Sequence, residues 1–425
     1  MTGIPSKFRL SGNIAVLTLL QMLMYATPLI TVPHLVRALG AGPYGVLTFT
    51  QAVVLHLDFL TDYGFNLSST RAVAIAKSNN IELGRVFWTT IAAKLCIMAA
   101  CAIALAVAIF CSPKLFEARW LYAGCFISVI GTAVFPVWLF RGLEQFAIFA
   151  GAFGSARLLT IPLIYTLVKG PRDLVTAAMI QASVEVVAAA LVIPLVKRVV
   201  PWYRPSICEV SSRLREGWPL FIAGVALFLS TSSTTLLLGL TTSTAVVAYY
   251  AAADKLIRAC SAMLTPLSGA LFPFIAAARG ESSESAVQVI RGSLALTTSL
   301  GLMSSIATFV LARPVANLVL GPAFAPSGEL LRWLSPLPAL WALADVLGTQ
   351  TLVVFQMDSV MSRSIMISAF CGLPLMLVLS KYLGAPGAAI ANTVVAGMML
   401  TGMTAAIQSR GLPIFFWKPS VANAE

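Results

Sequence analysis

The chain has 425 residues, of which 59% are hydrophobic and 10% are charged, and its mean hydropathy is +0.90. A soluble domain carries about 25% charged residues, so this composition excludes a soluble globular protein and indicates a polytopic membrane protein. The formal net charge of +12 does not indicate nucleic-acid binding, because the basic residues mark the ends of apolar segments instead of clustering on one water-exposed face.

Twelve membrane-spanning helices are predicted from the apolar segments, because about 20 apolar residues span a bilayer core. Their approximate ranges are 13–37, 43–65, 86–111, 119–140, 145–168, 174–196, 217–239, 244–270, 292–312, 330–355, 361–381 and 386–409. The first segment is too long for the apolar region of a signal peptide, so no signal peptide is expected. In the predicted loops, Lys and Arg are twice as frequent on one side of the membrane as on the other. Both termini belong to the richer side, so the positive-inside rule places them in the cytoplasm.

The midpoint of the sequence holds a stretch rich in Arg and Pro, residues 197–216, which is predicted to be a cytoplasmic linker. It separates an N-terminal six-helix bundle, residues 1–196, from a C-terminal six-helix bundle, residues 217–425. Internal repeats are common in transporters. The predicted fold class is therefore an all-α polytopic membrane protein with two six-helix halves around a central cavity.

Ionisable side chains occur near the middle of several predicted spans, where each costs about 2.5–3.5 kcal/mol on insertion scales. They are Lys94, Arg157, Glu185, Asp254, Lys255, Arg258 and Asp345. The free-energy cost would be large if all seven side chains faced lipid. We therefore expect them to face the interior of a helix bundle or a water-filled cavity.

The cations among these residues outnumber the anions, which favours a cavity that binds an anionic substrate. The cations predicted to line it are Lys94, Arg157, Lys255 and Arg258. Asp254 and Arg258 stand four residues apart on one predicted helix, so they can instead satisfy each other as a structural ion pair. The sequence leaves both interpretations open.

Three carboxylates are predicted to couple transport to an ion: Asp58, Glu185 and Asp345. A carboxyl group held away from water can exchange protons near neutral pH. For Asp58, a plain polar role at a helix end fits the sequence equally well. For Asp62, one turn later, we expect the polar end of a helix that faces cytoplasmic water.

Enzyme chemistry is not indicated by the sequence. It contains no P-loop, H-E-x-x-H or G-x-S-x-G motif, and its two histidines offer little for acid–base catalysis. The seven cysteines include no C-x-x-C pair and mostly lie in apolar segments, where cysteine behaves as a small hydrophobe. We therefore expect no disulfide, no metal site and no cofactor. A carrier is favoured over a channel, because the predicted buried charges form no repeated ring.

Several motifs resemble those of one transporter family. The amino-terminal motifs are Val32-Pro33-His34-Leu35-Val36-Arg37-Ala38-Leu39-Gly40, Tyr44-Gly45 with Gln51, and Asp62-Tyr63-Gly64-Phe65-Asn66-Leu67-Ser68-Ser69-Thr70-Arg71. A later set comprises Ala252-Ala253-Asp254-Lys255-Leu256-Ile257-Arg258-Ala259, Pro266-Leu267-Ser268 and Leu271-Phe272-Pro273. Together they resemble the Wzx-type polysaccharide flippases of the multidrug/oligosaccharidyl-lipid/polysaccharide exporter superfamily.

This resemblance implies a multi-pass protein of the bacterial inner membrane that works by alternating access. The implied substrate is an oligosaccharide linked to undecaprenyl pyrophosphate, which is moved from the cytoplasmic to the periplasmic leaflet during O-antigen or exopolysaccharide synthesis. A polysaccharide polymerase and a chain-length regulator are the protein partners that it implies, together with the lipid bilayer.

Other functions remain open at the level of the sequence. Within the superfamily they are a lipid II-type flippase and a multidrug antiporter. The lipid II flippases carry a similar Arg-x-Leu-Gly in their first helix, and by this partial analogy Arg37 is a candidate contact for the pyrophosphate. That family commonly has fourteen helices, where about twelve are predicted here. The alternative from a different class is a membrane-embedded polysaccharide polymerase or ligase.

Overall fold

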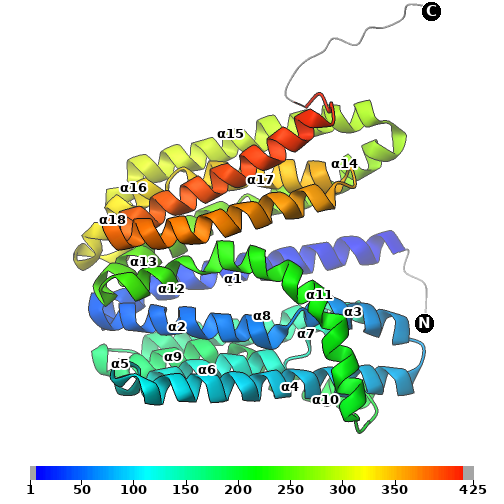
Figure 1. Cartoon of the computed structure of the whole chain (residues 1–425), viewed down its shortest axis with the longest axis horizontal. Coiled ribbons are helices and arrows are strands. Elements are labelled where there is room, and N and C mark those ends of the chain that lie inside the picture. Colours follow the sequence, from blue (N-terminus) through cyan, green and yellow to red (C-terminus); the bar gives the residue numbers. More distant parts are fainter. Residues whose placement is uncertain (1–5, 415–425) are drawn as a thin grey trace, which may run out of the picture. The chain divides into compact units, whose positions relative to one another are not determined.

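A computed structural model describes residues 6–414, and every regular element in that range is a helix (Figure 1). The chain divides into two compact units. Unit 1 runs to Phe228 and includes Ser243–Ala248, and unit 2 comprises Leu229–Thr242 and the chain from Tyr249 on. The two termini, predicted to be cytoplasmic, lie outside the described residues.

Unit 1 is a helical bundle with one helix, α6, at its centre. Its helices are α1 (Ser6–Leu39), α2 (Ala41–Asp62), α3 (Phe65–Ala76), α4 (Asn80–Cys111), α5 (Pro113–Glu117), α6 (Arg119–Val134), α7 (Val137–Gly142), α8 (Phe146–Leu167), the 3-10 turn η1 (Pro171–Asp173), α9 (Leu174–Ala182), α10 (Val184–Val199) and the first part of α11 (Ile207–Ser232). α6 packs against α2, α4, α9 and α10, and α8 packs against α1 and α10. Polar side chains on these helices are thereby brought towards α6.

Unit 2 is built around two long helices. It contains the end of α11, α12 (Thr234–Thr241), most of α13 (Thr244–Ala262), α14 (Thr265–Glu281), α15 (Ser283–Val315), η2 (Ala316–Leu320), η3 (Pro322–Phe324), α16 (Ala325–Leu334), α17 (Leu337–Asp345), η4 (Val346–Val353) and α18 (Asp358–Ser409). α15 packs against α14, α16 and α17, while α18 packs against α12, α16 and α17. η2 and η4 are π-helical turns, a form that often occurs at functional sites.

When the helices are counted by length and composition, fewer membrane spans are found than the twelve predicted. Among the described residues, 7 helices are long and apolar enough to cross a bilayer, or up to 10 if each bent helix pair is one span. α2, with 22 residues, stands outside that count, and α18 has 52 residues with a non-helical break at Gly384. Counting α2 and dividing α18 there would restore twelve, so this number stays a prediction.

The boundary between the units falls inside a helix. Residues 197–216, predicted as a linker, end α10, cross a short loop and begin α11 within unit 1. α11 is continuous from Ile207 to Ser232 and passes from unit 1 to unit 2 after Phe228. The linker predicted from charge and proline content therefore comes earlier in the chain than the boundary between the two units. The reason is that α11 continues through the change in composition.

The signature at residues 62–71 forms the connection between α2 and α3. α2 ends at Asp62, and both Tyr63 (φ 49°) and Gly64 (φ 75°) adopt left-handed conformations before α3 begins. The Tyr63 ring stacks on Phe221 of α11, with ring centroids 4.9 Å apart. In the neighbouring motif, a Cβ atom on Gly45 would lie 1.8 Å from the carbonyl oxygen of Thr244, so this close approach of two backbones requires glycine.

The predicted topology can be checked with reporter fusions. Fusions after Asn79, Ser206 and Ser283 are expected to report the cytoplasm, and fusions after Ser112, Gly170 and Gly321 the periplasm, because Lys and Arg accumulate on the first side. In unit 1, Arg85 at the start of α4 contacts Glu209 at the start of α11, so the first two sites belong to one end of the bundle. A consistent reversal, or loss of alternation beyond Ser206, would refute the arrangement.

Candidate functional site

A polar cluster forms in unit 1 where α6 is interrupted. Pro136 has no N–H group, so the carbonyl oxygen of Thr132, four residues earlier, lacks its usual helical partner. Lys94 of α4 replaces it: its Nζ donates to this oxygen at 3.2 Å and to Asp62 Oδ1 at 3.0 Å. The Lys94 side chain is only 2% exposed. The ammonium group is thus held inside the bundle by a carboxylate and a freed carbonyl.

The predicted ion-coupling residues Asp58 and Glu185 meet through one hydroxyl group. Thr132 Oγ1 lies 2.8 Å from Glu185 Oε2 and 3.2 Å from Asp58 Oδ1. Ser128 Oγ lies 3.0 Å from Asp58 Oδ2 and 3.0 Å from the carbonyl oxygen of Cys125. A hydroxyl has one proton to donate, so neither Thr132 nor Ser128 can donate to both of its neighbours. A proton on a carboxyl group would complete these hydrogen bonds, and the arrangement can therefore hold one.

Close helix packing brings Glu185 to this position. Glu185 stands in the first turn of α10, just after the break between α9 and α10 at Ser183. A Cβ atom added to Gly131 of α6 would lie 2.5 Å from the Glu185 Cβ. Because Gly131 lets the backbones of α6 and α10 approach, the Glu185 carboxylate reaches the hydroxyl of Thr132, the residue after Gly131.

Arg157 of α8 is the second residue of unit 1 among the cations predicted to line the cavity. It lies close enough to Glu185 for an electrostatic interaction. Its Nε is buried and has no hydrogen-bond partner among the described residues. Leaving a buried donor without an acceptor is costly, so the Arg157 Nε has the capacity to donate one further hydrogen bond.

Unit 2 carries the other two predicted cations on α13. Arg258 Nε donates to Asp254 Oδ2 at 2.7 Å, and Arg258 Nη2 donates to the carbonyl oxygen of Thr231 at 2.9 Å. The guanidinium also lies over the Trp341 ring, 5.6 Å from its centroid. Lys255 is half-buried on the same helix. The side chain of Arg258 remains 37% exposed, so this ion pair does not remove it from solvent.

Asp345 lies in a different polar group, at the junction of α17 and η4. Gln350, which is fully buried, donates to Ser268 Oγ at 2.9 Å and to Asp345 Oδ2 at 3.4 Å, and it accepts from Ser293. The π-helical turn of η4 turns Gln350 into this group. Arg37, the remaining predicted residue, is exposed in the last turn of α1.

The structure thus gathers Asp58, Lys94, Arg157 and Glu185 in unit 1 and Asp254, Lys255 and Arg258 in unit 2. The expectation that Asp62 is simply a helix end in water is wrong, because its carboxylate pairs with the buried Lys94. Sequence reasoning also missed Thr132, Ser128 and Gln350. Only Thr132 had a signal, the proline four residues further on.

Comparison with known proteins found a matching family model and similar proteins. A family model described as polysaccharide biosynthesis protein matches residues 10–279. A candidate O-antigen transporter of Escherichia coli K12 is 26% identical over 388 residues, 91% of this chain and 93% of the relative. Another from Shigella dysenteriae is 29% identical over 382 residues, 89% of this chain and 95% of the relative.

Two solved structures share the fold at low sequence identity. The lipid II flippase MurJ in an inward closed conformation has a TM-score of 0.76 at 11% identity, covering 92% of this chain and 87% of MurJ. An inward-facing multidrug resistance transporter of the MATE family, in the MOP superfamily, has a TM-score of 0.66 at 17% identity, covering 92% of this chain and 95% of that one. These likenesses concern the fold alone.

Proposed function

We propose a function on the basis of family membership: the chain belongs to the polysaccharide biosynthesis protein family, whose model matches residues 10–279. The resemblance found in the sequence is thereby confirmed. The chain is a multi-pass transporter of the bacterial inner membrane in the superfamily that includes the MATE proteins, and it is not an enzyme. The polymerase or ligase alternative is set aside, because the relatives are named as transporters.

The substrate in this proposal is an O-antigen repeat unit linked to undecaprenyl pyrophosphate, moved from the cytoplasmic to the periplasmic leaflet by alternating access. The names of the two relatives support the O-antigen part. The observation that supports an anionic substrate most directly is the buried Nε of Arg157, which lacks a partner among the described residues. A pyrophosphate offers acceptors that a guanidinium binds well. A polymerase and a chain-length regulator would be its partners in the membrane.

The remaining cations extend the same proposal. Lys255 and Arg258 lie on one helix of unit 2, and we assign them to the substrate together with Arg157 and the exposed Arg37. Lys94 is engaged with Asp62 in this conformation, so its contact with substrate would require that pair to open. A multidrug antiporter is less favoured, since an excess of positive charge suits organic cations poorly.

A transport assay separates the substrates. Purified protein in proteoliposomes would be given fluorescent undecaprenyl-pyrophosphate oligosaccharide, lipid II or an organic cation. We expect flipping of the first at a rate at least tenfold above that of the other two. Preferential movement of lipid II would select the lipid II-type flippase, and movement of the cation alone would contradict the proposal.

The carboxylates near Thr132 suggest how transport is driven. In this proposal Asp58 and Glu185 exchange a proton during the cycle, because the hydroxyls of Thr132 and Ser128 cannot satisfy every acceptor around them. Asp345 with Gln350 is the corresponding candidate in unit 2. Sodium remains an alternative ion for the same carboxylates.

Replacing Asp58 by asparagine is expected to abolish the response of transport to an imposed pH gradient, because an amide cannot take up or release the proton. The measurement is the flipping rate in proteoliposomes with and without a pH or a sodium gradient. Asp358→Asn, at an exposed carboxylate in the first turn of α18, is the matched control and should respond like the unmodified protein. Rates that are indifferent to both gradients would make these acids structural partners only.

A further inference from the structure

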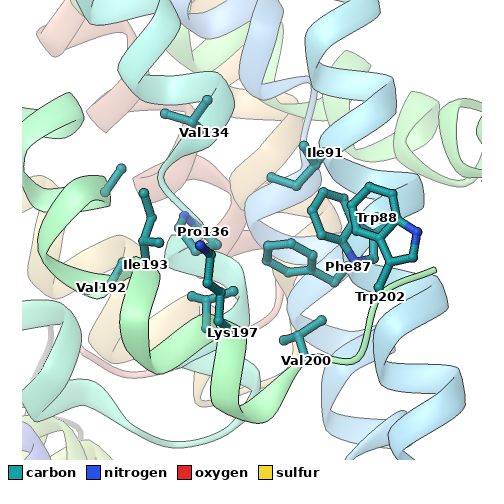
Figure 2. A pocket seen from close by; sticks show the side chains of 12 residues that line it. Phe87, Trp88, Ile91, Val134, Pro136, Val192, Ile193, Lys197, Val200 and Trp202 are labelled. Atoms are coloured by element: carbon teal, nitrogen blue, oxygen red, sulfur yellow. The ribbon is translucent and has the colours of Figure 1, made fainter. Parts of the chain in front are cut away.

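An apolar pocket lies in unit 1, away from the polar cluster. It has a volume of about 530 Å³ and opens between the start of α4, the break between α6 and α7, and the end of α10 (Figure 2). Phe87, Ile91, Val134, Val192 and Ile193 are among the residues that line it. Pockets of about 300–1,000 Å³ hold small ligands, so this space is large enough for several links of a hydrocarbon chain.

One cation and two tryptophans mark the rim of this pocket. Lys197, in the last turn of α10, projects into it (Figure 2) and forms no ion pair among the described residues. Trp88 and Trp202 meet edge to face, with ring centroids 4.3 Å apart, and Trp202 is 75% exposed. Tryptophan favours the level of the lipid headgroups. The pocket therefore combines an apolar interior with a positively charged, interfacial mouth.

The outer wall of the pocket is held in place by hydrogen bonds. It is formed by Val200 and Trp202 of the loop between α10 and α11. Trp88 Nε1 donates to the carbonyl oxygen of Pro201 in this loop at 3.2 Å. The wall is thus tied to α4.

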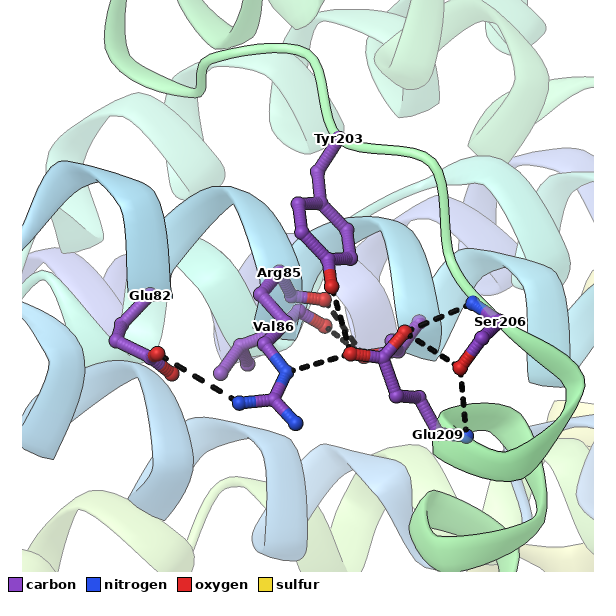
Figure 3. Close-up of polar contacts among 7 residues, drawn as sticks. Glu82, Arg85, Val86, Tyr203, Ser206 and Glu209 are labelled. Carbon is purple, nitrogen blue, oxygen red and sulfur yellow. Dashed lines mark hydrogen bonds and ion pairs between the residues drawn. The ribbon is translucent and has the colours of Figure 1, made fainter.

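A second anchor fixes the far end of the same loop. The Glu209 carboxylate accepts hydrogen bonds from Arg85 Nε at 2.8 Å, the Tyr203 hydroxyl at 2.6 Å and the Ser206 backbone N–H at 2.8 Å (Figure 3). The bond to this carboxylate raises the pKa of the Tyr203 hydroxyl above its usual value, so the hydroxyl keeps its proton as a donor. Arg85 joins this anchor to α4, as the Trp88 bond does.

The end of unit 1 that carries the pocket also carries an excess of basic residues. Besides Lys197, these include Arg85, Arg198 and Arg204. The positive-inside rule assigns such an end to the cytoplasmic leaflet, which is rich in anionic lipids. Basic pockets between transmembrane helices on this side suit acidic lipid headgroups.

We propose that this pocket binds one acyl chain of an anionic bilayer phospholipid, with the lipid phosphate beside the Lys197 ammonium group. The apolar walls match the chain, and the charge of Lys197 matches the phosphate. All walls belong to unit 1, so the lipid can stay in place through the transport cycle, whereas the tail of a transported lipid must leave with its headgroup. The occupant is therefore a resident lipid that stabilises unit 1, not the substrate.

Native mass spectrometry of the full-length protein, titrated with phosphatidylglycerol or phosphatidylcholine, tests this assignment. We expect phosphatidylglycerol to bind more tightly, and Lys197→Ala to weaken it by about tenfold, since a hydrogen bond to a charged group is lost. Arg198→Ala, at the next residue outside the pocket, is the matched control and should retain the lipid. Ile193→Trp should block the chain, whereas Leu191→Trp, at an equally exposed position on α10 that does not line the pocket, should not.

Two kinds of result would overturn the proposal. One is equal binding of the two phospholipids, or equal loss in the Lys197 and Arg198 variants, which would remove the role of Lys197. The other is displacement of phosphatidylglycerol by a lower concentration of a long-chain polyprenyl phosphate, which would assign the pocket to the tail of the substrate. The flipping assay is read separately, so failure of the transport proposal would leave this one standing.

Discussion

Replacing Asp62 by alanine is expected to destabilise the protein by about 3–5 kcal/mol, the usual cost of leaving one member of a buried ion pair without its partner. Lys94 is 2% exposed, and Asp62 Oδ1 is the one carboxylate oxygen that its Nζ contacts within hydrogen-bond distance among the described residues. The carbonyl oxygen of Thr132 would then be left to hold the ammonium alone. Thermal unfolding of the purified protein in detergent would measure the loss.

An exposed ion pair provides the matched control. Lys77 and Glu144 approach to 3.5 Å, but their side chains are 50% and 69% exposed. Glu144→Ala should therefore change the stability by less than about 1 kcal/mol. The double variant Asp62→Leu with Lys94→Met should recover most of the loss, because a buried pair can be replaced by apolar residues at little cost. An Asp62→Ala protein as stable as the Glu144→Ala protein would mean that Glu185 takes over the ammonium.

For unit 1, the sequence predicts which ionisable residues lie inside the bundle, but not how they pair. Charged side chains in apolar segments stand out because water is absent there, and this identified Lys94, Arg157 and Glu185. The hydroxyl groups in the cluster have no such feature: Thr132, which contacts Glu185, and Ser128, which contacts Asp58, resemble many other hydroxyls in apolar helices. Which hydroxyl lies beside a carboxylate depends on helix rotation and on the close approach at Gly131, and neither has a local sequence signal.

Helix breaks were likewise predictable only in part. Pro136 ends α6 for a reason that the sequence contains, since proline removes a backbone donor. The π-helical turn η4 contains no proline, and within it Gln350 contacts Asp345. The division at Phe228 within α11 is set by contacts between distant segments, which composition does not report.

Removing the guanidinium of Arg258 is expected to reduce surface polysaccharide at least tenfold while the protein still reaches the membrane. Arg258→Ala removes a cation that is 37% exposed despite its ion pair with Asp254, and loss of a charged hydrogen bond costs about 1.5–3 kcal/mol of substrate binding. Lys255→Ala should have a similar effect. The measurement is surface polysaccharide in a strain that lacks its own flippase, with membrane levels of each variant determined in parallel.

The partner of Arg258 distinguishes substrate binding from structural neutralisation. If Arg258 serves mainly to neutralise Asp254, then Asp254→Ala should be as damaging as Arg258→Ala, and the double variant should recover. If Arg258 binds the pyrophosphate, Asp254→Ala should be the milder change, and the double variant should remain inactive. Arg258→Lys should restore only part of the activity, because it keeps the charge but lacks the planar pair of donors that a phosphate accepts. Full recovery in the double variant would reduce this site to a structural ion pair.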